Sequence, residues 1–576
     1  MNTTPSSNYV NFSGVAGTVT IASNTIINAN TLFFGTAGYT LAGTDSTSIL
    51  NLSGSSPNTT PLINASGVTV TLSVKITGTS GFTTGANGTI ILSSDLSGLS
   101  GTVTIVSGGR ISGSLTGGQY QAWVNNGTLT SNNTGTTASD NTTVQIGSLS
   151  GSGLLRAGGS NTAAATDTFE IGALNTDTVY SGTIANSGVL KAAVKKVGTG
   201  TLTLSGSNTY TGLTTIASGT LQLGNGGTTG SLATSSTIVN NGTLAVNRSN
   251  TSTQGIDFST AAITGTGSFI QAGSGTTILS AANTYTGDTI VSAGTLQIDG
   301  AVASGTVAVG NGATLAGSGT ASGIVKASNA RINGSGLTLG ATTLTGTSTL
   351  SGYNIASSVT VASGTTSLTG TTKSTSALSV SAGATLNANG TIAGSATVDG
   401  LLKGNSTITG DLTLTSGTLA PGNSAGITKV QGKFSTDALS TLVAEVSGTV
   451  AGTSYDQVQV SGNVTLAGTL DLSTLSSLTV GSTITLIDNT GSGTTTGYFA
   501  TLITSGSTYT LTSNSNYTFT VGSTEYLLSY TSSTEGDGYS NDVTLTVVPE
   551  PSTWAMVMGG IGMLAFGQRL RHREVD

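Results

Sequence analysis

The chain has 576 residues, of which 85 are glycine and only 7% are charged, where about 25% is usual. Its net charge is -7 and 36% of its residues are hydrophobic, which is not the composition of a disordered chain. The sequence therefore predicts an ordered protein whose solubility rests on hydroxyl and amide groups. The acidic pI, about 4.7, and the lack of a basic stripe argue against a nucleic-acid partner.

Two residue types that carry much of enzyme chemistry are scarce. There is no cysteine, which excludes disulfides, thiolate metal ligands and cysteine nucleophiles. The single histidine is His572, so a Ser-His-Asp triad, a histidine-ligated zinc and a histidine base are excluded from the body of the chain. We expect no catalytic residue, no cofactor and no metal.

The N-terminal residues Met1–Pro5 are polar and lack a basic region followed by an apolar stretch, so they do not form an export signal. The C-terminal tail described below predicts export. We therefore expect the true start, with its signal, to lie upstream of Met1. The alternative is a pseudogene product that is not exported.

The body of the chain is a repeat array. The clearest unit covers residues 196–224, and a second copy covers residues 268–300. Shorter Gly-Thr-Leu or Ala-Thr-Leu pieces recur between residues 126 and 419. Within a unit, as in Thr201–Ser205, leucines alternate with hydroxyl residues, which is the period of a β-strand.

Strands of about 4 to 6 residues end at Gly or Asn, which accept the positive φ of tight corners. Such strands wind into coils that bury their aliphatic side chains by stacking on neighbouring coils. We predict coils of roughly 20 to 25 residues, with corner Asn side chains laddering from coil to coil. Helical periodicity is essentially absent before Trp554.

The unit from Gly198 to Leu223, with Asn208 and Tyr210 at its centre, resembles the autotransporter-associated β-strand repeat. Proteins that bear this repeat are similar to autotransporter passengers, and the resemblance implies an all-β fold, a long right-handed parallel β-helix (solenoid). The second copy lacks the leading Lys but keeps Asn283 and Tyr285. Residues 417–426 and 455–462 look like the last part of such passengers. We expect no translocator barrel after residue 545 and therefore no self-secretion.

We divide the chain into a β-helix repeat body (residues 1–430), terminal β coils with a cap (431–545) and a sorting tail (546–576). The division near residue 430 rests on longer apolar runs and more aromatic residues downstream. A cap is expected because an open sheet edge must be covered.

Candidate chemical groups in the body are few. Asp288 and Asp299 fall in one repeat, and we expect them to act as solvated corner residues. Lys195-Lys196 is expected to be a solvated strand end. Tyr210 and Tyr285 occupy equivalent repeat positions, so we expect stacking between coils rather than sugar binding.

An acidic stretch near the C-terminus offers oxygen ligands in Glu535, Asp537, Asn541 and Asp542. Their order does not match a calcium-binding EF-hand loop or a nonapeptide calcium roll. We interpret the stretch as an ordinary acidic loop.

The C-terminal tail is the most informative segment. Pro549, Glu550 and Pro551 precede an apolar stretch from Trp554 to Gly567, and three arginines follow: Arg569, Arg571 and Arg573. The apolar run of about 14 residues is short of the roughly 20 that a bilayer span usually needs. By the positive-inside rule the arginines would stay cytoplasmic and the rest of the chain outside. The alternative is a buried or amphipathic C-terminal helix of a soluble domain.

In order and spacing the tail resembles the PEP-CTERM signal of Gram-negative bacteria. The resemblance implies an exosortase-type membrane enzyme as partner, export, and attachment to extracellular polysaccharide or the cell-surface matrix. It further implies a single C-terminal hydrophobic helix that anchors the protein transiently in the inner membrane.

Three hypotheses follow. The first is an exported structural or adhesin-like β-helical protein of the outer cell surface or extracellular matrix, which is not an enzyme. The second is a β-helical polysaccharide lyase or glycoside hydrolase, which needs two carboxylates on one face. The third is an ice- or crystal-binding protein, which needs regular Thr-x-Thr ranks such as Thr201-Leu202-Thr203.

Overall fold

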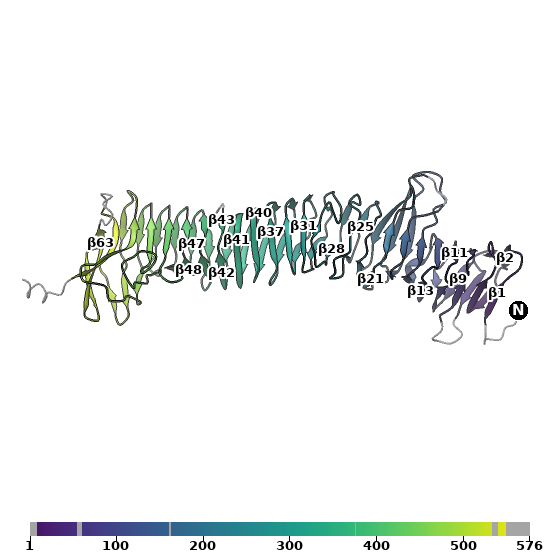
Figure 1. Ribbon diagram of the computed structural model, residues 1–576, viewed down its shortest axis with the longest axis horizontal. Coiled ribbons are helices and arrows are strands. Elements are labelled where there is room, and N and C mark those ends of the chain that lie inside the picture. Colours follow the sequence, from purple (N-terminus) through teal and green to yellow (C-terminus); the bar gives the residue numbers. More distant parts are fainter. Residues whose placement is uncertain (1–7, 54–59, 160–162, 375, 533–539, 549–576) are drawn as a thin grey trace, which may run out of the picture. The chain divides into compact units, whose positions relative to one another are not determined.

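The computed structural model describes residues 8–53, 60–159, 163–374, 376–532 and 540–548. The chain divides into two compact units between Gly323 and Ile324. Each unit consists mainly of short β-strands stacked in parallel rows, with the chain visiting the rows in turn (Figure 1).

The first part of unit 1 has three such rows, and consecutive strands along the chain belong to different rows. The first row contains β1 (Tyr9–Phe12), β4 (Thr31–Phe34), β7 (Leu62–Asn64), β10 (Gly81–Thr84), β13 (Thr102–Ile105), β15 (Ala122–Asn125) and β18 (Ser148–Ser150). The second contains β2 (Thr18–Ile21), β5 (Thr40–Gly43), β8 (Thr69–Leu72), β11 (Thr89–Leu92), β14 (Arg110–Gly113), β16 (Thr128–Thr130), β19 (Leu154–Arg156) and β22 (Thr183–Ala185). The third contains β3 (Ile26–Ala29), β6 (Ile49–Leu52), β9 (Lys75–Gly78) and β12 (Gly98–Leu99).

The second part of unit 1 continues the same arrangement in four further rows. One row contains β17 (Thr142–Ile146), β20 (Thr166–Ile171), β23 (Lys191–Lys196), β25 (Thr214–Ile216) and β27 (Ile238–Asn240). The next contains β21 (Thr178–Tyr180), β24 (Thr201–Leu204), β26 (Thr220–Leu223), β28 (Thr243–Val246), β30 (Ser268–Gln271), β33 (Thr289–Val291) and β36 (Thr306–Val309). The third contains β29 (Ser252–Thr253), β31 (Thr276–Leu279), β34 (Thr295–Ile298) and β37 (Thr314–Gly317). The fourth contains β32 (Ala282–Asn283), β35 (Ala301–Val302) and β38 (Thr320–Ala321). The one helical element among the described residues is the 3₁₀ turn η1 (Gly118–Tyr120).

Unit 2 begins with β39 (Ile324–Ser328) and two strands of 15 residues, β40 (Arg331–Thr345) and β41 (Thr347–Val361), which pair in parallel along their length. Three rows of short strands follow from β41. The first contains β42 (Thr365–Leu368), β45 (Thr385–Ala388), β48 (Leu401–Gly404), β51 (Thr418–Pro421), β54 (Thr441–Val443), β57 (Thr469–Leu472) and β60 (Thr501–Thr504). The second contains β43 (Thr371–Ser374), β46 (Thr391–Ala393), β49 (Thr407–Ile408), β52 (Ile427–Val430), β55 (Gln457–Val460) and β58 (Thr483–Asn489). The third contains β44 (Leu378–Val380), β47 (Ala396–Val398), β50 (Leu412–Leu414), β53 (Phe434–Thr436), β56 (Val464–Leu466) and β59 (Thr495–Gly497).

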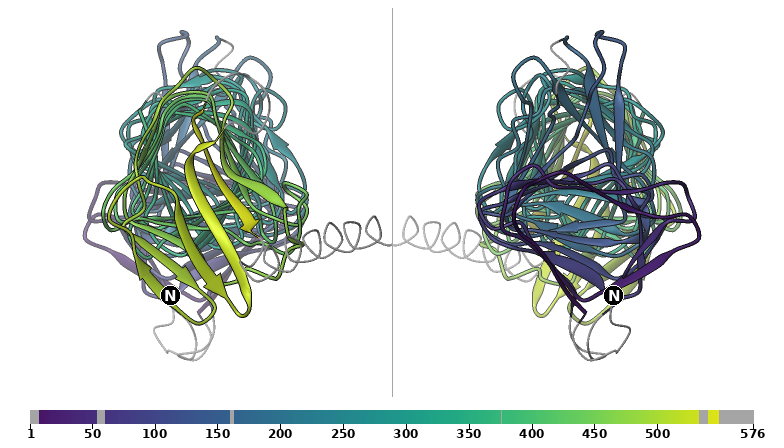
Figure 2. Two further views of the ribbon diagram at one scale, coloured as in Figure 1. Left: turned by 90° about the vertical axis from the view of Figure 1, so that its left-hand side faces the viewer. Right: turned by 90° about the vertical axis from the view of Figure 1, so that its right-hand side faces the viewer.

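The last described strands of unit 2 are antiparallel: β61 (Thr508–Thr510), β62 (Tyr517–Val521), β63 (Thr524–Ser532) and β64 (Asp542–Val548). β61 pairs with β60, while β64 lies between β58 and β63. The left-hand view of Figure 2 shows these strands in yellow-green across this end of the unit. β64 covers the hydrogen-bonding edge of β58 and β61 covers that of β60, so two of the three rows end in an antiparallel partner.

The alternation of side chains builds the core, as expected from the sequence. In β26 the leucines Leu221 and Leu223 are buried, whereas Thr220 and Gln222 are half-buried on the outer side. The corners rest on glycine where the backbones of neighbouring coils approach. At Gly219, whose φ is 63°, a Cβ would lie 2.4 Å from the carbonyl oxygen of Gly198 in the adjacent coil.

The prediction of a parallel β-solenoid is confirmed, and its right-handedness stays a prediction. The number of residues between paired positions varies, from Thr385 with Leu401 to Thr469 with Thr501, so the expected 20 to 25 residues per coil is too narrow. The parallel pairing runs through residue 430, as β52 with β55 shows, and the division proposed there stays a prediction. The predicted C-terminal helix lies outside the described residues, among which no helix is long and apolar enough to cross a bilayer.

Candidate functional site

The predicted sorting residues Pro549, Glu550, Pro551, Arg569, Arg571 and Arg573 lie outside the described residues. The strand that precedes them, β64, is firmly held. Val543 and Leu545 are fully buried, and the backbone N–H of Val547 donates to the carbonyl oxygen of Ser482 at 2.9 Å. The tail therefore starts directly after a strand that is paired on both sides.

The two repeat copies share a buried tyrosine. Tyr210 and Tyr285 are each fully buried, and their hydroxyls lie 2.7 Å from the hydroxyls of Thr214 and Thr289. Burial raises the pKa of both tyrosines above its ordinary value. The Thr214 hydroxyl also contacts Ser236 at 2.8 Å. Both rings therefore belong to the interior and are not available to a sugar. Tyr285 lies 6.2 Å from the ring of Phe269, whereas the expected stacking of Tyr210 stays a prediction.

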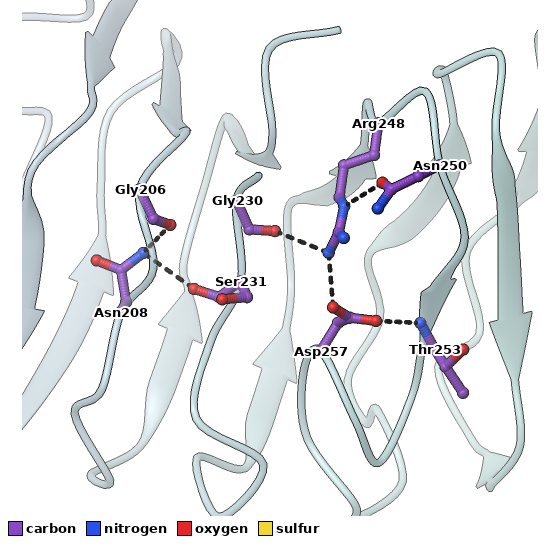
Figure 3. A network of polar contacts seen from close by, with 8 residues as sticks. All are labelled: Gly206, Asn208, Gly230, Ser231, Arg248, Asn250, Thr253 and Asp257. Atoms are coloured by element: carbon purple, nitrogen blue, oxygen red, sulfur yellow. Dashed lines mark hydrogen bonds and ion pairs between the residues drawn. The ribbon is translucent and has the colours of Figure 1, made fainter. Parts of the chain in front are cut away.

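The repeat asparagines also have equivalent partners. Asn208 accepts a hydrogen bond from the backbone N–H of Ile184 at 2.9 Å, and Asn283 accepts one from Ile263 at 2.9 Å. Asn208 donates in turn to the carbonyl oxygens of Gly206 and Ser231 (Figure 3). Each asparagine thus ties its own corner to a neighbouring coil.

The expectation that Lys195-Lys196 is a solvated strand end is wrong for Lys196. Its side chain is buried, and its Nζ donates to the carbonyl oxygens of Val197 at 2.7 Å and Gly198 at 3.0 Å. Burial lowers the pKa of Lys196 to about 8, against a smaller upward effect of Asp177. Alternation explains the placement, because Lys196 follows the buried Val194 by two residues.

Lys195 points the other way and forms an ion pair with Glu170 at 2.8 Å on the outer face. In the second repeat Gln271 takes the place of Lys196. Its Nε2 donates to the carbonyl oxygens of Gly273 at 2.8 Å and Gly275 at 3.2 Å. A neutral amide therefore holds the glycine corner that a lysine holds in the first repeat.

An ion pair that the sequence analysis missed lies between the two repeats. Arg248 is 6% exposed, and its Nη1 lies 2.8 Å from Oδ1 of Asp257 (Figure 3). Its Nε donates to Asn250 at 3.0 Å, and Asp257 accepts the backbone N–H of Thr253 at 2.8 Å. Both charges are satisfied within the fold, so they form a structural clamp. The local sequence Asn247–Asn250 contains no pattern that predicts this ion pair.

Asp288 and Asp299, the two acidic residues singled out in the second repeat, each accept a backbone hydrogen bond. Asp288 accepts the backbone N–H of Thr306 at 3.2 Å, and Asp299 accepts that of Ser318 at 3.4 Å, so each serves a corner of the next coil. Within the described ranges, no three His, Cys, Asp or Glu side chains are grouped so as to hold a metal ion.

Asp456 is a buried carboxyl of unit 2, with 2% of its surface exposed. Burial raises its pKa to about 7, opposed by hydrogen bonds from Glu445 and Gly426. Its two oxygens accept the backbone N–H groups of Gly426 at 2.7 Å and Glu445 at 2.9 Å. The two hydrogen bonds tie the backbone at Gly426 to the backbone at Glu445 through one side chain.

Half of the proposed acidic loop is described. Asn541 donates to the carbonyl oxygens of Gly491 and Gly493, each at 2.9 Å, and Asp542 accepts the backbone N–H of Asn489 at 3.0 Å. These contacts join β64 to β58 and the loop after it. Glu535 and Asp537 lie outside the described residues.

On the face of the first repeat, threonines at paired positions form one row along the stacked strands, and not two adjacent rows. Thr201, Thr220 and Thr243 are paired in register and are followed by Ser268. The second rank begins at Thr203 and continues as Gln222, Ala245 and Ile270. The double rank that ice or crystal binding needs is therefore not formed on this face.

Comparison with known proteins agrees with both sequence resemblances. Residues 194–223 and 269–298 match the family described as passenger-associated-transport-repeat, and residues 547–572 match the PEP-CTERM protein-sorting motif. The second match includes Pro549, Glu550, Pro551, Arg569 and Arg571, and it ends one residue before Arg573.

The chain is similar to the adhesin BmaC autotransporter of Brucella suis biovar 1 (strain 1330), with 47% identity over 85 residues. This match covers 15% of the chain and 2% of the adhesin. The crystal structure of the Haemophilus influenzae Hap adhesin aligns with a TM-score of 0.36 and 14% identity, covering 94% of this chain and 64% of that one. The chain therefore spans only a small part of the curated relative it matches. It carries passenger-associated transport repeats within a parallel β-solenoid and a PEP-CTERM sorting motif at its C-terminal end.

Proposed function

We propose that the protein is an exported structural or adhesin-like component of the outer cell surface or extracellular matrix. The observation that carries the proposal is the sorting motif at residues 547–572, joined directly to a β-solenoid with transport repeats. The similarity to an autotransporter adhesin supports the same class of function.

The side chains of the body fit a role in display rather than chemistry. Lys196, Arg248 and Asp456 are each held by backbone carbonyl or N–H groups or by an ion pair within the fold. The outer faces present threonine, asparagine and glutamine, as at Thr220 and Gln222. Such faces make many weak polar contacts, which suit binding to polysaccharide or matrix.

The C-terminal tail directs the protein to the cell surface in this proposal. In our proposal an exosortase-type membrane enzyme recognises Pro549, Glu550 and Pro551, while Arg569, Arg571 and Arg573 stay on the cytoplasmic side. The apolar stretch then anchors the protein transiently in the inner membrane.

The polysaccharide-degrading alternative has no supporting arrangement among the described residues. Its strongest candidate, Asp456, has both oxygens occupied by backbone N–H groups. A glycoside hydrolase needs two carboxylates that face a substrate from either side of the scissile bond.

Fractionation of the producing cells tests the proposal. Antibodies against unit 2 should detect the protein at the surface, where added protease degrades it in intact cells. A double substitution Pro549→Ala and Pro551→Ala should leave the protein in the inner-membrane fraction, and Ser552→Ala is the matched control. Recovery of the intact full-length wild-type protein in the cytosol would refute surface display.

A further inference from the structure

The outer side of the second row of unit 2 carries an exposed tyrosine in line with hydroxyl groups and a lysine. Tyr353 of β41 pairs with Thr371 of β43, and the pairing continues through Thr391 and Thr407 to Lys429 of β52. These residues alternate with buried neighbours, so they point outward from successive coils. We call this surface, from Tyr353 to Lys429, the second-row face (β41 and β43 are labelled in Figure 1).

A second line of outward residues runs beside the first on the same face. Ile355 of β41 pairs with Lys373 of β43, which pairs with Ala393 of β46. Lys373 and Lys429 are both exposed, whereas Ile355 and Ala393 are half-buried. Tyr353 is 43% exposed, unlike the fully buried repeat tyrosines. The face therefore offers an aromatic ring, apolar side chains, hydroxyls and two ammonium groups on one surface.

This part of the chain has a charge opposite to that of the whole. Residues 324–433 carry six basic and two acidic side chains, although the net charge of the chain is -7. Residues 434–548 carry nine acidic side chains and no basic one. The two acids of the first segment lie in corners outside the second-row face, Asp399 after β47 and Asp411 before β50. The positive charge is therefore local.

The two lysines of the face are not used by the fold. Within the described part of the chain, neither Lys373 nor Lys429 forms an ion pair with a carboxylate. None of the paired outward residues from Tyr353 to Lys429 is acidic. Lys195 of unit 1, by contrast, pairs with Glu170. Ammonium groups placed in this way suit an anionic ligand, because a charge-assisted hydrogen bond to a carboxylate is stronger than a neutral one.

We propose that the second-row face binds a polysaccharide built from uronic acid residues, with the polymer lying along the stack of coils. The ring of Tyr353 stacks on the apolar face of one sugar, and Lys373 and Lys429 pair with carboxylates. The hydroxyls of Thr371 and Thr391 bond to the hydroxyls of the sugars between them. This inference rests on the proposed function and deepens it, because it names the chemical class of the ligand and the surface that takes it.

The spacing of the groups favours a sugar polymer over other polyanions. Lys373 and Lys429 are three coils apart, which is about 14 Å at the usual distance between strands. A nucleic acid presents phosphates at a much closer spacing and is bound by more closely placed cations. Thr371, Thr391 and Thr407 supply one hydroxyl per coil, a step similar to that of one sugar in an extended polysaccharide.

Binding of the purified full-length chain to immobilised polygalacturonate tests the proposal, in a mild non-ionic detergent that shields the apolar tail. We expect saturable binding that weakens as salt is added. Lys373→Gln combined with Lys429→Gln should weaken it by about tenfold, through the loss of two exposed ion pairs. Lys326→Gln combined with Lys403→Gln is the matched control. It removes the same charge from strands outside the second row and should change the affinity by less than about twofold.

Tyr353 separates stacking from charge. Tyr353→Ala should weaken binding by about tenfold, whereas Tyr353→Phe should retain it, because the ring rather than the hydroxyl makes the contact. Unchanged thermal midpoints establish that the variants are folded.

A fluorescent label locates the contact. The chain has no cysteine, so Thr391→Cys supplies a single labelling position on the second-row face and Thr397→Cys one on the third row. The label at position 391 should respond to polygalacturonate, and the label at position 397 should not.

Three results would overturn the proposal: no binding of polygalacturonate, equal weakening by both double variants, or equally tight binding of dextran or DNA. Fractionation of cells keeps this result apart from the proposed function. A surface-displayed protein that does not bind polygalacturonate refutes the ligand alone. Wild-type protein recovered intact in the cytosol refutes surface display, whatever the purified chain binds.

Discussion

The carboxylate of Asp456 accepts the backbone N–H of Gly426 at 2.7 Å, and this bond joins two segments that are distant in sequence. Gly426 is the last residue of the stretch 417–426, and Asp456 is the second residue of the stretch 455–462, both of which the sequence singles out. The backbone N–H of Gln457 adds a parallel bond to the carbonyl oxygen of Gly426 at 2.9 Å. The two stretches therefore act as one structural element of unit 2.

Asp456 should make unit 2 more stable at acid pH. Burial raises its folded-state pKa to about 7 from 3.8, so the folded state binds a proton more readily than the unfolded state. The stabilisation is fully present below pH 3.8 and is lost as the pH rises through 7. Between pH 4.5 and 8 we expect a loss of about 3 kcal/mol in the free energy of unfolding, measured by urea titration. In Asp456→Asn this loss should disappear.

Asp437 is the control for this pH dependence because its shift has the opposite sign. A hydrogen bond from the Ser440 hydroxyl, with others from the backbone, holds the pKa of Asp437 below its ordinary value. Asp437 therefore stabilises the fold above its unfolded pKa and loses that contribution on acidification. Asp437→Asn should leave the loss between pH 4.5 and 8 in place. If Asp456→Asn retains the full loss, burial of this carboxyl is not its source.

Lys196 should give unit 1 an alkaline dependence. Its folded pKa is about 8 against 10.5 in the unfolded chain, so the unfolded state binds more protons between these values. The free energy of unfolding then rises with pH, by about 2 kcal/mol from pH 7.5 to 10. Fluorescence of the buried Trp123 reports unit 1, in a Trp554→Phe background.

Lys196→Gln should abolish that rise and still fold, because Gln271 already holds the equivalent corner in the second repeat. Lys195→Gln is the matched control. It removes an outer-face ion pair with Glu170, which is worth less than about 1 kcal/mol, and keeps Lys196. An unfolded Lys196→Gln protein would contradict the equivalence of the two corners.

The two repeat tyrosines should differ in their tolerance of phenylalanine. In Tyr210→Phe the Thr214 hydroxyl keeps Ser236 as a partner at 2.8 Å. In Tyr285→Phe the Thr289 hydroxyl, which is fully buried, loses the one partner it has among the described residues. We expect a cost of about 1 kcal/mol for Tyr210→Phe and up to about 3 kcal/mol for Tyr285→Phe, from urea titrations at neutral pH. Equal costs would show that Thr289 finds another acceptor.

Two buried threonines of unit 2 should be better replaced by valine. The hydroxyls of Thr366 and Thr372 are buried and have no hydrogen-bond partner among the residues that the structure describes. Their positions in the next coil are held by Leu386 and Ile392. Because an unpaired buried hydroxyl costs free energy, Thr366→Val and Thr372→Val should each stabilise unit 2 by about 1 kcal/mol. The exposed Thr365→Val is the control and should change the thermal midpoint little.

The fold follows from local pattern to a large extent. Leu202 and Leu204 alternate with Thr201, and glycine or asparagine closes each strand, which suffices to predict stacked coils. Thr203 departs from the pattern because Gln222 of the next coil covers it, with Nε2 3.5 Å from its hydroxyl. Such cover depends on the register between coils, which alternation does not specify.

The buried charged side chains were harder to predict from the sequence than the strands. Lys196 was expected in solvent because a lysine is rarely buried, yet its position two residues after Val194 indicates the inward face. Aligning the two repeats places Gln271 at the same position, and a second long polar side chain there is the signal that was available. An alignment of the repeats does not identify Asp257 as the partner of Arg248, because Asp257 lies in a loop between coils.

The variable separation of paired residues has a consequence for engineering. Thr418 pairs with Thr441, and Thr441 pairs with Thr469. A hairpin between Thr441 and Thr469, marked by the bridge of Val446 with Tyr455, adds residues without breaking either ladder. The extra residues lie in the bends between strands, so the pairing of the strands does not depend on the length or sequence of the bends. Val450, 60% exposed in this hairpin, marks a place where a foreign epitope or enzyme tag could be grafted.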